Sequence, residues 1–290
     1  MTFCHLNLHT DRSIMRGMIK PAALVDWCKR NGVKAAAVTD YGNMSAVIEL
    51  YKACKDTDVM PIYGMEINLV EDKTEKDKKS TRMILLAKNR AGFKNLLTIA
   101  TIGSMYFYYI PRVDIDVLAQ HGDNLIALTG DIDGIAAQAF FRSREDGLME
   151  VYDELSAIFG DDVYFEIEPV PSEPQRILNE AIVDMFKQTS GIMQIVATGD
   201  PHYLNESDRH LHENVMAIKQ VRNPGWIYPM KGPYHVRTRE EMIAQFSELH
   251  ERDIANELGF KDALDAPDEI ISKIERFDLR EGVKIPDFVS

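Results

Sequence analysis

The sequence predicts an α/β fold in which a parallel sheet closes into a barrel. Strand-like segments alternate with amphipathic helical segments along most of the chain, and seven strands are expected. Several of these strands are almost continuously apolar, which is typical of parallel strands buried on both faces. With this many strand–helix units, a barrel is favoured over an open sheet, and a barrel carries its chemistry at the C-terminal ends of its strands.

The first half of the chain supplies four of the predicted strands, over residues 3–10, 34–40, 60–70 and 81–89. Apolar residues near helical spacing predict helices over 19–32, 45–57 and 92–106. Gly32 is the expected end of the first helix. The charged stretch 71–80 is predicted to be a solvated hairpin loop.

The second half continues the alternation, with strands predicted over 124–131, 163–170 and 193–204. Helices are expected over 134–159 and 173–191. After Glu206 the sequence is mostly helical, apart from the Pro- and Gly-rich segment 220–236. We therefore expect one domain over 1–290, with the barrel over about 1–205 and a helical C-terminal part over about 206–290.

Composition limits the classes of function. Lys and Arg number 33 against 46 Asp and Glu, so the net charge of −13 argues against a surface that holds nucleic acid unaided. It suits a site that gathers divalent cations, a partner that supplies positive charge, or simply a soluble acidic protein. No apolar run approaches the roughly 20 residues of a membrane span. Three scattered cysteines and the absence of a signal peptide predict reduced thiols in a cytoplasmic protein.

Nucleotide-binding loops are not found. The first strand is not followed by G-x-G-x-x-G, and no G-x-x-x-x-G-K-[ST] stretch occurs. An open doubly wound sheet stays possible, but its usual nucleotide chemistry is unsupported. No serine lies in a G-x-S-x-G turn, so a serine nucleophile is not expected either.

Polar residues gather at the ends of five predicted strands, and metal-ligand types dominate among them: His9, Asp40, Glu66, Asp131, Asp200 and His202. Such a rim suits a divalent cation such as Zn²⁺ or Mn²⁺, which could activate water and polarise a phosphoryl oxygen. Asp40 could equally be a turn or cap residue. Glu66 is harder to dismiss, because a carboxylate inside an apolar strand needs a partner.

Two histidine pairs need separate treatment. His5, Asn7 and His9 share one face if residues 3–10 form a strand, and that row could be a metal edge or a surface row. His210 and His212 lie at the start of a predicted helix, where side chains two apart diverge. One of these two could pack under the barrel rim, and neither is expected to be a ligand.

Six stretches of the chain resemble successive motifs of one known family. They cover residues 3–17, 35–51, 61–69, 82–96, 125–131 and 195–215. These segments are similar to the PHP (polymerase and histidinol phosphatase) domain, above all to the version at the N-terminus of bacterial DNA polymerase III alpha subunits, the C-family replicases. Residues 283–288 (VKIPDF) resemble the segment that leads from this domain into the polymerase palm.

The resemblance implies a distorted (β/α)₇ TIM-like barrel with a mostly helical C-terminal extension. Active members of the family hold up to three metals with nine ligands and act as phosphoesterases, including a 3′–5′ exonuclease in some polymerases. Carried over by motif, the ligand positions retained are His9, Glu66, Asp200 and His202, with Asp131 changed but still able to bind metal. The substituted positions are Asn7, Arg16, Tyr41 and Arg82, while His5 becomes a bystander.

Two substitutions by arginine suggest that the multinuclear site is broken. A guanidinium is permanently protonated and cannot coordinate a metal. Arg16 and Arg82 are therefore expected to pair with the leftover carboxylates, which are Glu66, Asp131 or Asp200. The resemblance then implies an inactive module that stabilises or binds the palm and thumb of a C-family polymerase core, meets DNA only indirectly and contacts no membrane.

The alternative is an enzyme, namely a metal-dependent phosphoesterase or 3′–5′ exonuclease with a reduced metal site. A single Zn²⁺, Mn²⁺ or Mg²⁺ ion would be held by His9, Glu66 and Asp200. His202 or His9 would then orient the attacking water, with Asp200 and His202 as the catalytic pair. A third possibility is a barrel that binds some other phosphorylated ligand, and a site without any metal is also open.

Overall fold

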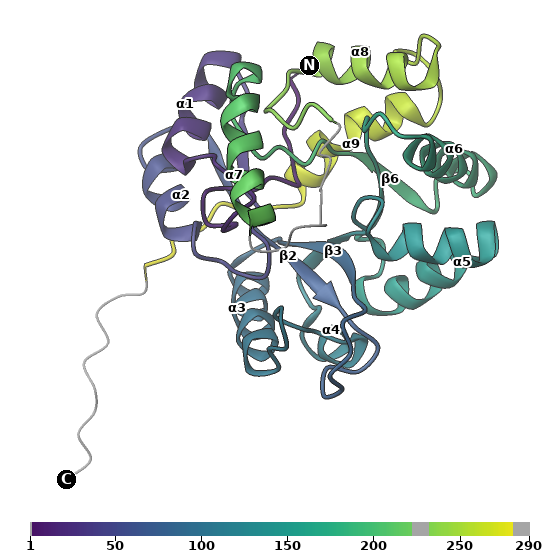
Figure 1. Ribbon diagram of the computed structural model, residues 1–290, viewed down its shortest axis with the longest axis horizontal. Helices are drawn as coiled ribbons and strands as arrows, with labels where there is room; N and C mark the ends of the chain where they lie inside the picture. Colours follow the sequence, from purple (N-terminus) through teal and green to yellow (C-terminus); the bar gives the residue numbers. More distant parts are fainter. Residues whose placement is uncertain (1, 222–231, 281–290) are drawn as a thin grey trace.

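The protein is described by a computed structural model over residues 2–221 and 232–280. Six strands form one curled sheet in sequence order, and Figure 1 shows helices arranged around it. The strands are β1 (Ala35–Val38), β2 (Met60–Leu69), β3 (Thr81–Ala87), β4 (Leu125–Leu128), β5 (Val163–Ile167) and β6 (Gln194–Ala197). The α/β class is confirmed, whereas the sheet is a six-stranded half-barrel in place of the predicted seven strands.

The helices confirm most of the predicted segments. They are α1 (Pro21–Asn31), α2 (Val47–Cys54), α3 (Arg90–Met105), α4 (Ile115–His121), α5 (Ile135–Phe159), α6 (Glu173–Gln188), α7 (Arg209–Val221), α8 (Arg239–His250) and α9 (Phe260–Ser272). Gly32 ends α1 with a φ of 69°, the left-handed conformation that glycine adopts without strain. Among the described residues, no helix is long and apolar enough to cross a membrane.

The strands are not all parallel, which corrects the prediction. β1 pairs with β2, β4 with β5, and β5 with β6, all in parallel, but β3 runs antiparallel to both of its neighbours. Residues 71–80, the charged loop, make the β2–β3 connection without the crossover helix that a parallel pair requires. As a result, the N-terminal end of β3 lies beside the C-terminal end of β2, with Arg82 paired to Asn68.

Residues 3–10 are not a strand, although they were predicted to be the first one. Single contacts replace a ladder: Thr39 N donates to Leu8 O at 3.0 Å, and Leu8 N donates to Thr39 Oγ1 at 2.7 Å. On the other side, His9 N donates to Pro201 O at 3.0 Å. The segment therefore bridges the residues that follow β1 and β6 without becoming a strand of the sheet.

Two hydrophobic cores lie on the two faces of the sheet. In β3, Met83 belongs to one core and Ile84 to the other, because successive side chains point to opposite faces. Helix α9 contributes to both cores, with Leu264 in the first and Ile270 in the second. The tail motif 283–288 and most of the segment 220–236 lie outside the described residues.

Two glycines of α3 provide a matched test of this packing. A Cβ added at Gly92 would lie 2.1 Å from the backbone oxygen of Asn124, whereas the nearest atom to one at Gly103 would be a Val113 methyl at 3.3 Å. We expect Gly92→Ala to lower the free energy of unfolding by about 1–3 kcal/mol. Gly103→Ala should be neutral or slightly stabilising, because alanine favours a helix. Urea unfolding of both variants checks this, and equal effects would contradict the packing.

Candidate functional site

The side chains predicted for the site converge at one end of the sheet from five segments of the chain. His9 comes from the irregular segment 3–10, Glu66 from β2 and Arg82 from the start of β3. Asp131 follows β4, while Asp200 and His202 follow β6. The antiparallel direction of β3 matters here, because it brings Arg82 to the same end of the sheet as the carboxyl ends of the parallel strands.

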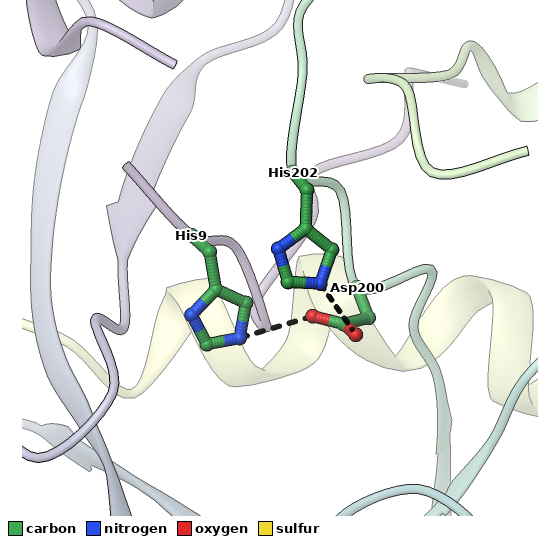
Figure 2. A group of neighbouring side chains, drawn as sticks. All are labelled: His9, Asp200 and His202. Carbon is green, nitrogen blue, oxygen red and sulfur yellow. Dashed lines mark hydrogen bonds and ion pairs between the residues drawn. The ribbon is translucent and has the colours of Figure 1, made fainter. Parts of the chain in front are cut away.

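The centre of the site consists of His9, Asp200 and His202 (Figure 2). His9 Nε2 lies 3.0 Å from Asp200 Oδ1, and His202 Nε2 lies 3.0 Å from Asp200 Oδ2. The two imidazole rings stack at a centroid distance of 4.7 Å and an interplanar angle of 9°. All three residues are buried, so one carboxylate bridges the Nε2 edges of two stacked rings away from solvent.

The backbone around Asp200 is set by a residue far along the chain. Asp200 has a φ of 42°, a left-handed conformation that is uncommon outside glycine and that Asp tolerates better than most residues. Arg237 donates an Nη2 hydrogen bond to Gly199 O at 2.7 Å. A Cβ at Gly199 would lie 2.3 Å from that guanidinium, so only glycine fits beside it.

Asp40 orients His9 indirectly, through the side chain of Ser13. Ser13 donates its hydroxyl proton to Asp40 Oδ1 at 2.7 Å, and the Ser13 oxygen lies 3.0 Å from both His9 Nδ1 and Tyr41 N. Since the serine proton is directed to the carboxylate, His9 Nδ1 must carry a hydrogen and donate. This fixes which ring nitrogen faces the centre, namely Nε2, as partners behind a histidine ligand do in metal sites.

Two carboxylate oxygens at the centre lack hydrogen bonds. Asp200 Oδ1 and Glu66 Oε2 are buried and accept none, although they lie 3.0 and 3.2 Å from His9 Nε2. Burial would lower the pKa of His9, but Asp200 and then Glu66 outweigh it and raise that pKa. A proton on His9 Nε2 or a bound cation can compensate the charge of these two oxygens. Imidazole and carboxylate side chains are also the types that bind a divalent metal.

Arg82 neutralises the other side of the same cluster, as predicted. Its guanidinium lies 3.1 Å from Glu66 Oε1 and 3.3 Å from Asp131 Oδ2, and it also contacts Asp133. Glu66 therefore presents one oxygen to the arginine and the other to His9. Burial raises the pKa of Asp131 to about 6, against the opposing effect of Arg82.

The prediction for Arg16 is wrong. Within the described residues it forms no ion pair with the site carboxylates, and its guanidinium lies 4.0 Å from the ring centroid of Tyr41. Tyr41 in turn donates its hydroxyl to Asn68 Oδ1. Arg16 and Tyr41, both predicted to be substituted ligand positions, therefore contact each other through a cation–π interaction.

The remaining predicted residues lie around this centre. Asn7 is buried with its Nδ2 3.5 Å from Glu166 Oε1, so it does not join His9. His212 packs at the rim, as one of its pair was expected to do: it contacts Arg16 O at 2.6 Å and stacks on His202 at 5.4 Å. His210 is exposed.

Sequence reasoning missed two buried acids, Glu166 and Glu168. The Thr198 hydroxyl lies 2.8 Å from Glu166 Oε1 and 2.9 Å from Glu168 Oε1. One hydroxyl has one proton to give, so at least one of the two carboxyl groups carries its own proton. Burial raises the pKa of Glu166 to about 8. Their spacing of two on an apolar strand was the available signal, the same kind that singled out Glu66.

Comparisons with known proteins identify a family and its relatives. The family described as PHP domain matches residues 5–169. DNA polymerase III subunit alpha of Aquifex aeolicus is 34% identical over 76% of this chain and 20% of its own length. The Helicobacter pylori protein of the same name is 29% identical over 98% of this chain and 24% of its own length. The chain thus spans about a fifth to a quarter of these curated relatives.

The solved structures include a more distant likeness. An amidohydrolase from Chromobacterium violaceum superposes with a TM-score of 0.42 at 11% sequence identity. That comparison covers 69% of this chain and 87% of the other protein.

Removing the Arg82 charge is expected to destabilise the protein strongly at neutral pH. Arg82→Gln would leave Glu66 and Asp131 without their cation, and breaking such a buried pair costs about 3–5 kcal/mol. Arg12→Gln is the matched control, because Arg12 contacts Glu49 in solvent and exposed pairs contribute about 0–1 kcal/mol. Chemical unfolding at pH 7 measures both changes; a loss below 1 kcal/mol for Arg82→Gln would contradict the assigned contacts.

The buried Glu166 should make stability depend on pH. Because its pKa in the folded state is raised to about 8, the folded chain keeps a proton that the unfolded chain loses above roughly pH 4.5. The free energy of unfolding therefore falls as pH rises through this window. Relative to the wild type, Glu166→Gln should gain about 2–4 kcal/mol between pH 5 and pH 8.5.

Glu150→Gln is the control for this measurement, since Glu150 is exposed on α5. It should leave the pH profile of unfolding unchanged. A Glu166→Gln profile parallel to that of the wild type would show that the carboxyl group is ionised in the fold.

Proposed function

Because this chain belongs to the PHP domain family, we propose that it is a degenerate PHP module that stabilises or binds a C-family DNA polymerase core and does not hydrolyse phosphoesters. The observation that carries this proposal is the position of Arg82. Its guanidinium contacts Glu66, Asp131 and Asp133, where a multinuclear centre would need carboxylate oxygens for metals. A guanidinium cannot coordinate metal and stays charged at any working pH.

The contacts of the other substituted positions support the same reading. Arg16 and Tyr41 satisfy each other, and Asn7 turns to Glu166. These side chains link the segments at the end of the sheet that carries the candidate site, which we call the mouth. Their polar contacts need no metal. What is kept is therefore the shape of the mouth, whereas the set of ligand atoms for several metals is reduced.

The polymerase context rests on the relatives. Both proteins named above are DNA polymerase III alpha subunits, in which the matched region is a fifth to a quarter of the length. A net charge of −13 suits a module whose partner carries the DNA-facing positive charge. Contact with DNA would then be indirect, and we expect the assembly to be cytoplasmic.

A second candidate function is a phosphoesterase or 3′–5′ exonuclease with one metal, and the unbonded oxygens of Asp200 and Glu66 favour it. Together with His9 Nε2 they could hold a single Zn²⁺, Mn²⁺ or Mg²⁺ ion. A metal bound there would lower the pKa of a coordinated water and polarise a phosphoryl oxygen. His202 Nε2 donates to the ionised Asp200, while the buried Nδ1 of His202 has no partner and could accept a proton there.

Metal content and nuclease activity separate the two candidates. For the chain purified without chelator we expect less than stoichiometric metal and no cleavage of a single-stranded oligodeoxynucleotide with Mn²⁺ or Zn²⁺. Asp200→Ala is the matched control, because it removes the carboxylate that bridges the two imidazoles and should change neither result. Stoichiometric metal with an activity that Asp200→Ala abolishes would overturn the inactive module and establish the one-metal enzyme.

A further inference from the structure

The connection between α3 and α4 exposes an unusual run of large side chains. Met105, Phe107 and Tyr109 are 76%, 61% and 68% exposed, and Tyr106 is 36% exposed. We call these four residues the aromatic patch. Single exposed apolar residues are ordinary on a protein surface, but several gathered in one segment mark an interaction site.

Hydrogen bonds from neighbouring residues hold the segment of the aromatic patch in place. Buried Arg112 donates Nε to Tyr106 O at 3.0 Å and contacts Glu75 O with its Nη1. Lys73 Nζ donates to Asp114 Oδ2 at 2.9 Å. These contacts tie the α3–α4 connection to the charged loop 71–80. A surface that is already ordered loses less conformational entropy when a partner binds.

The backbone of the patch also carries strain. Tyr109 has a φ of 63°, the left-handed region in which a bulky side chain costs roughly 1–2 kcal/mol. Tyr108 N donates to Ile110 O at 3.1 Å and holds the turn. Glycine or asparagine would suit this conformation better, yet the position presents an exposed tyrosine. Strain of this kind collects at functional positions.

The aromatic patch borders the end of the sheet that carries the candidate site. Val113 N donates to Asn68 O at 3.0 Å, and Asn68 Nδ2 donates to Pro111 O at 3.1 Å. Asn68 also accepts from Tyr41, which lies at the mouth. In Figure 1, α3 and α4 lie side by side at the lower edge of the molecule, with the segment that carries the patch between them.

Charge around the aromatic patch favours a protein partner. Lys73 lies 5.4 Å from the Tyr106 ring centroid and Lys78 lies 4.5 Å from that of Tyr109. Loop 71–80 carries four lysines but also four acidic residues, so its net charge is zero and it lacks the basic footprint that binds phosphates. Aromatic and methionine side chains at the centre with charged residues at the rim are typical of protein–protein interfaces.

We propose that the aromatic patch is the docking surface for a C-family polymerase core, through a partner face that is apolar at its centre and acidic where it meets the rim lysines. The partner rests on the proposed function. The surface itself rests on its exposed rings, its buried support and its rim charge. Phe107 and Tyr109 would enter the partner as anchors, while Lys78 would meet an acidic group.

The test uses a C-family polymerase core that lacks its own PHP domain, titrated calorimetrically with this chain. The wild type should bind, and Phe107→Ser with Tyr109→Ser should weaken binding at least tenfold. Ile192→Ser with Leu258→Ser is the matched control, because these residues are 67% and 61% exposed outside the patch. It should bind as the wild type does. Lys78 does not pack into the hydrophobic core of this chain. Lys78→Glu should weaken binding of the polymerase core severalfold and reduce the salt dependence of that binding.

Each outcome decides between the claims. If the wild type binds and the patch variants bind equally well, the docking surface is wrong while the proposed function stands. If the wild type does not bind the polymerase core, the docking surface and the proposed function are both wrong. Binding of a single-stranded oligodeoxynucleotide or self-association that the patch variants lose, with core binding unchanged, would assign the patch to that other occupant and overturn the proposal.

Discussion

Buried negative charge at the mouth of the sheet is the constraint on which the rest of the site depends. Glu66, Asp200, Glu166 and Glu168 are almost entirely removed from water, where an uncompensated carboxylate would cost several kcal/mol. The chain compensates this charge in three ways. The Arg82 guanidinium contacts Glu66, and two imidazole nitrogens face the oxygens of Asp200. At least one of Glu166 and Glu168 is protonated, and both contact the Thr198 hydroxyl. Every segment that ends at the mouth contributes to one of these solutions.

Because the cation at this mouth is an arginine side chain, charge compensation there does not depend on a bound metal. A metal can dissociate and its affinity follows pH and supply, whereas a guanidinium is present whenever the protein is folded. The ion pairs of Arg82 therefore link β2, β3 and the turn after β4 permanently. Around His9, by contrast, two carboxylate oxygens lack hydrogen bonds, so the two halves of the site have different chemistry.

Much of this could be predicted from the sequence, because it depends on periodicity and on single residues. Helical and strand spacing placed most elements, and an inward carboxylate without a local partner indicated Glu66. The pairing of Arg82 with Glu66 was predicted only through the family resemblance. The same reasoning wrongly predicted a strand over residues 3–10, because the backbone partners of this segment, Thr39 and Pro201, are remote in sequence. The contact of Arg16 with Tyr41 likewise depends on how two turns meet, which no local pattern encodes.

The placement of α9 in both cores has a consequence for how the chain acquires its structure. Leu264 and Ile270 complete packing that begins near the N-terminus, and beyond them Glu275 N donates to Lys88 O. Phe277 closes an aromatic cluster with Tyr63 and Phe93. Contacts between residues so distant in sequence imply a high contact order. During synthesis on the ribosome the packing of the sheet would remain incomplete until α9 had emerged, so the two cores are completed late and together.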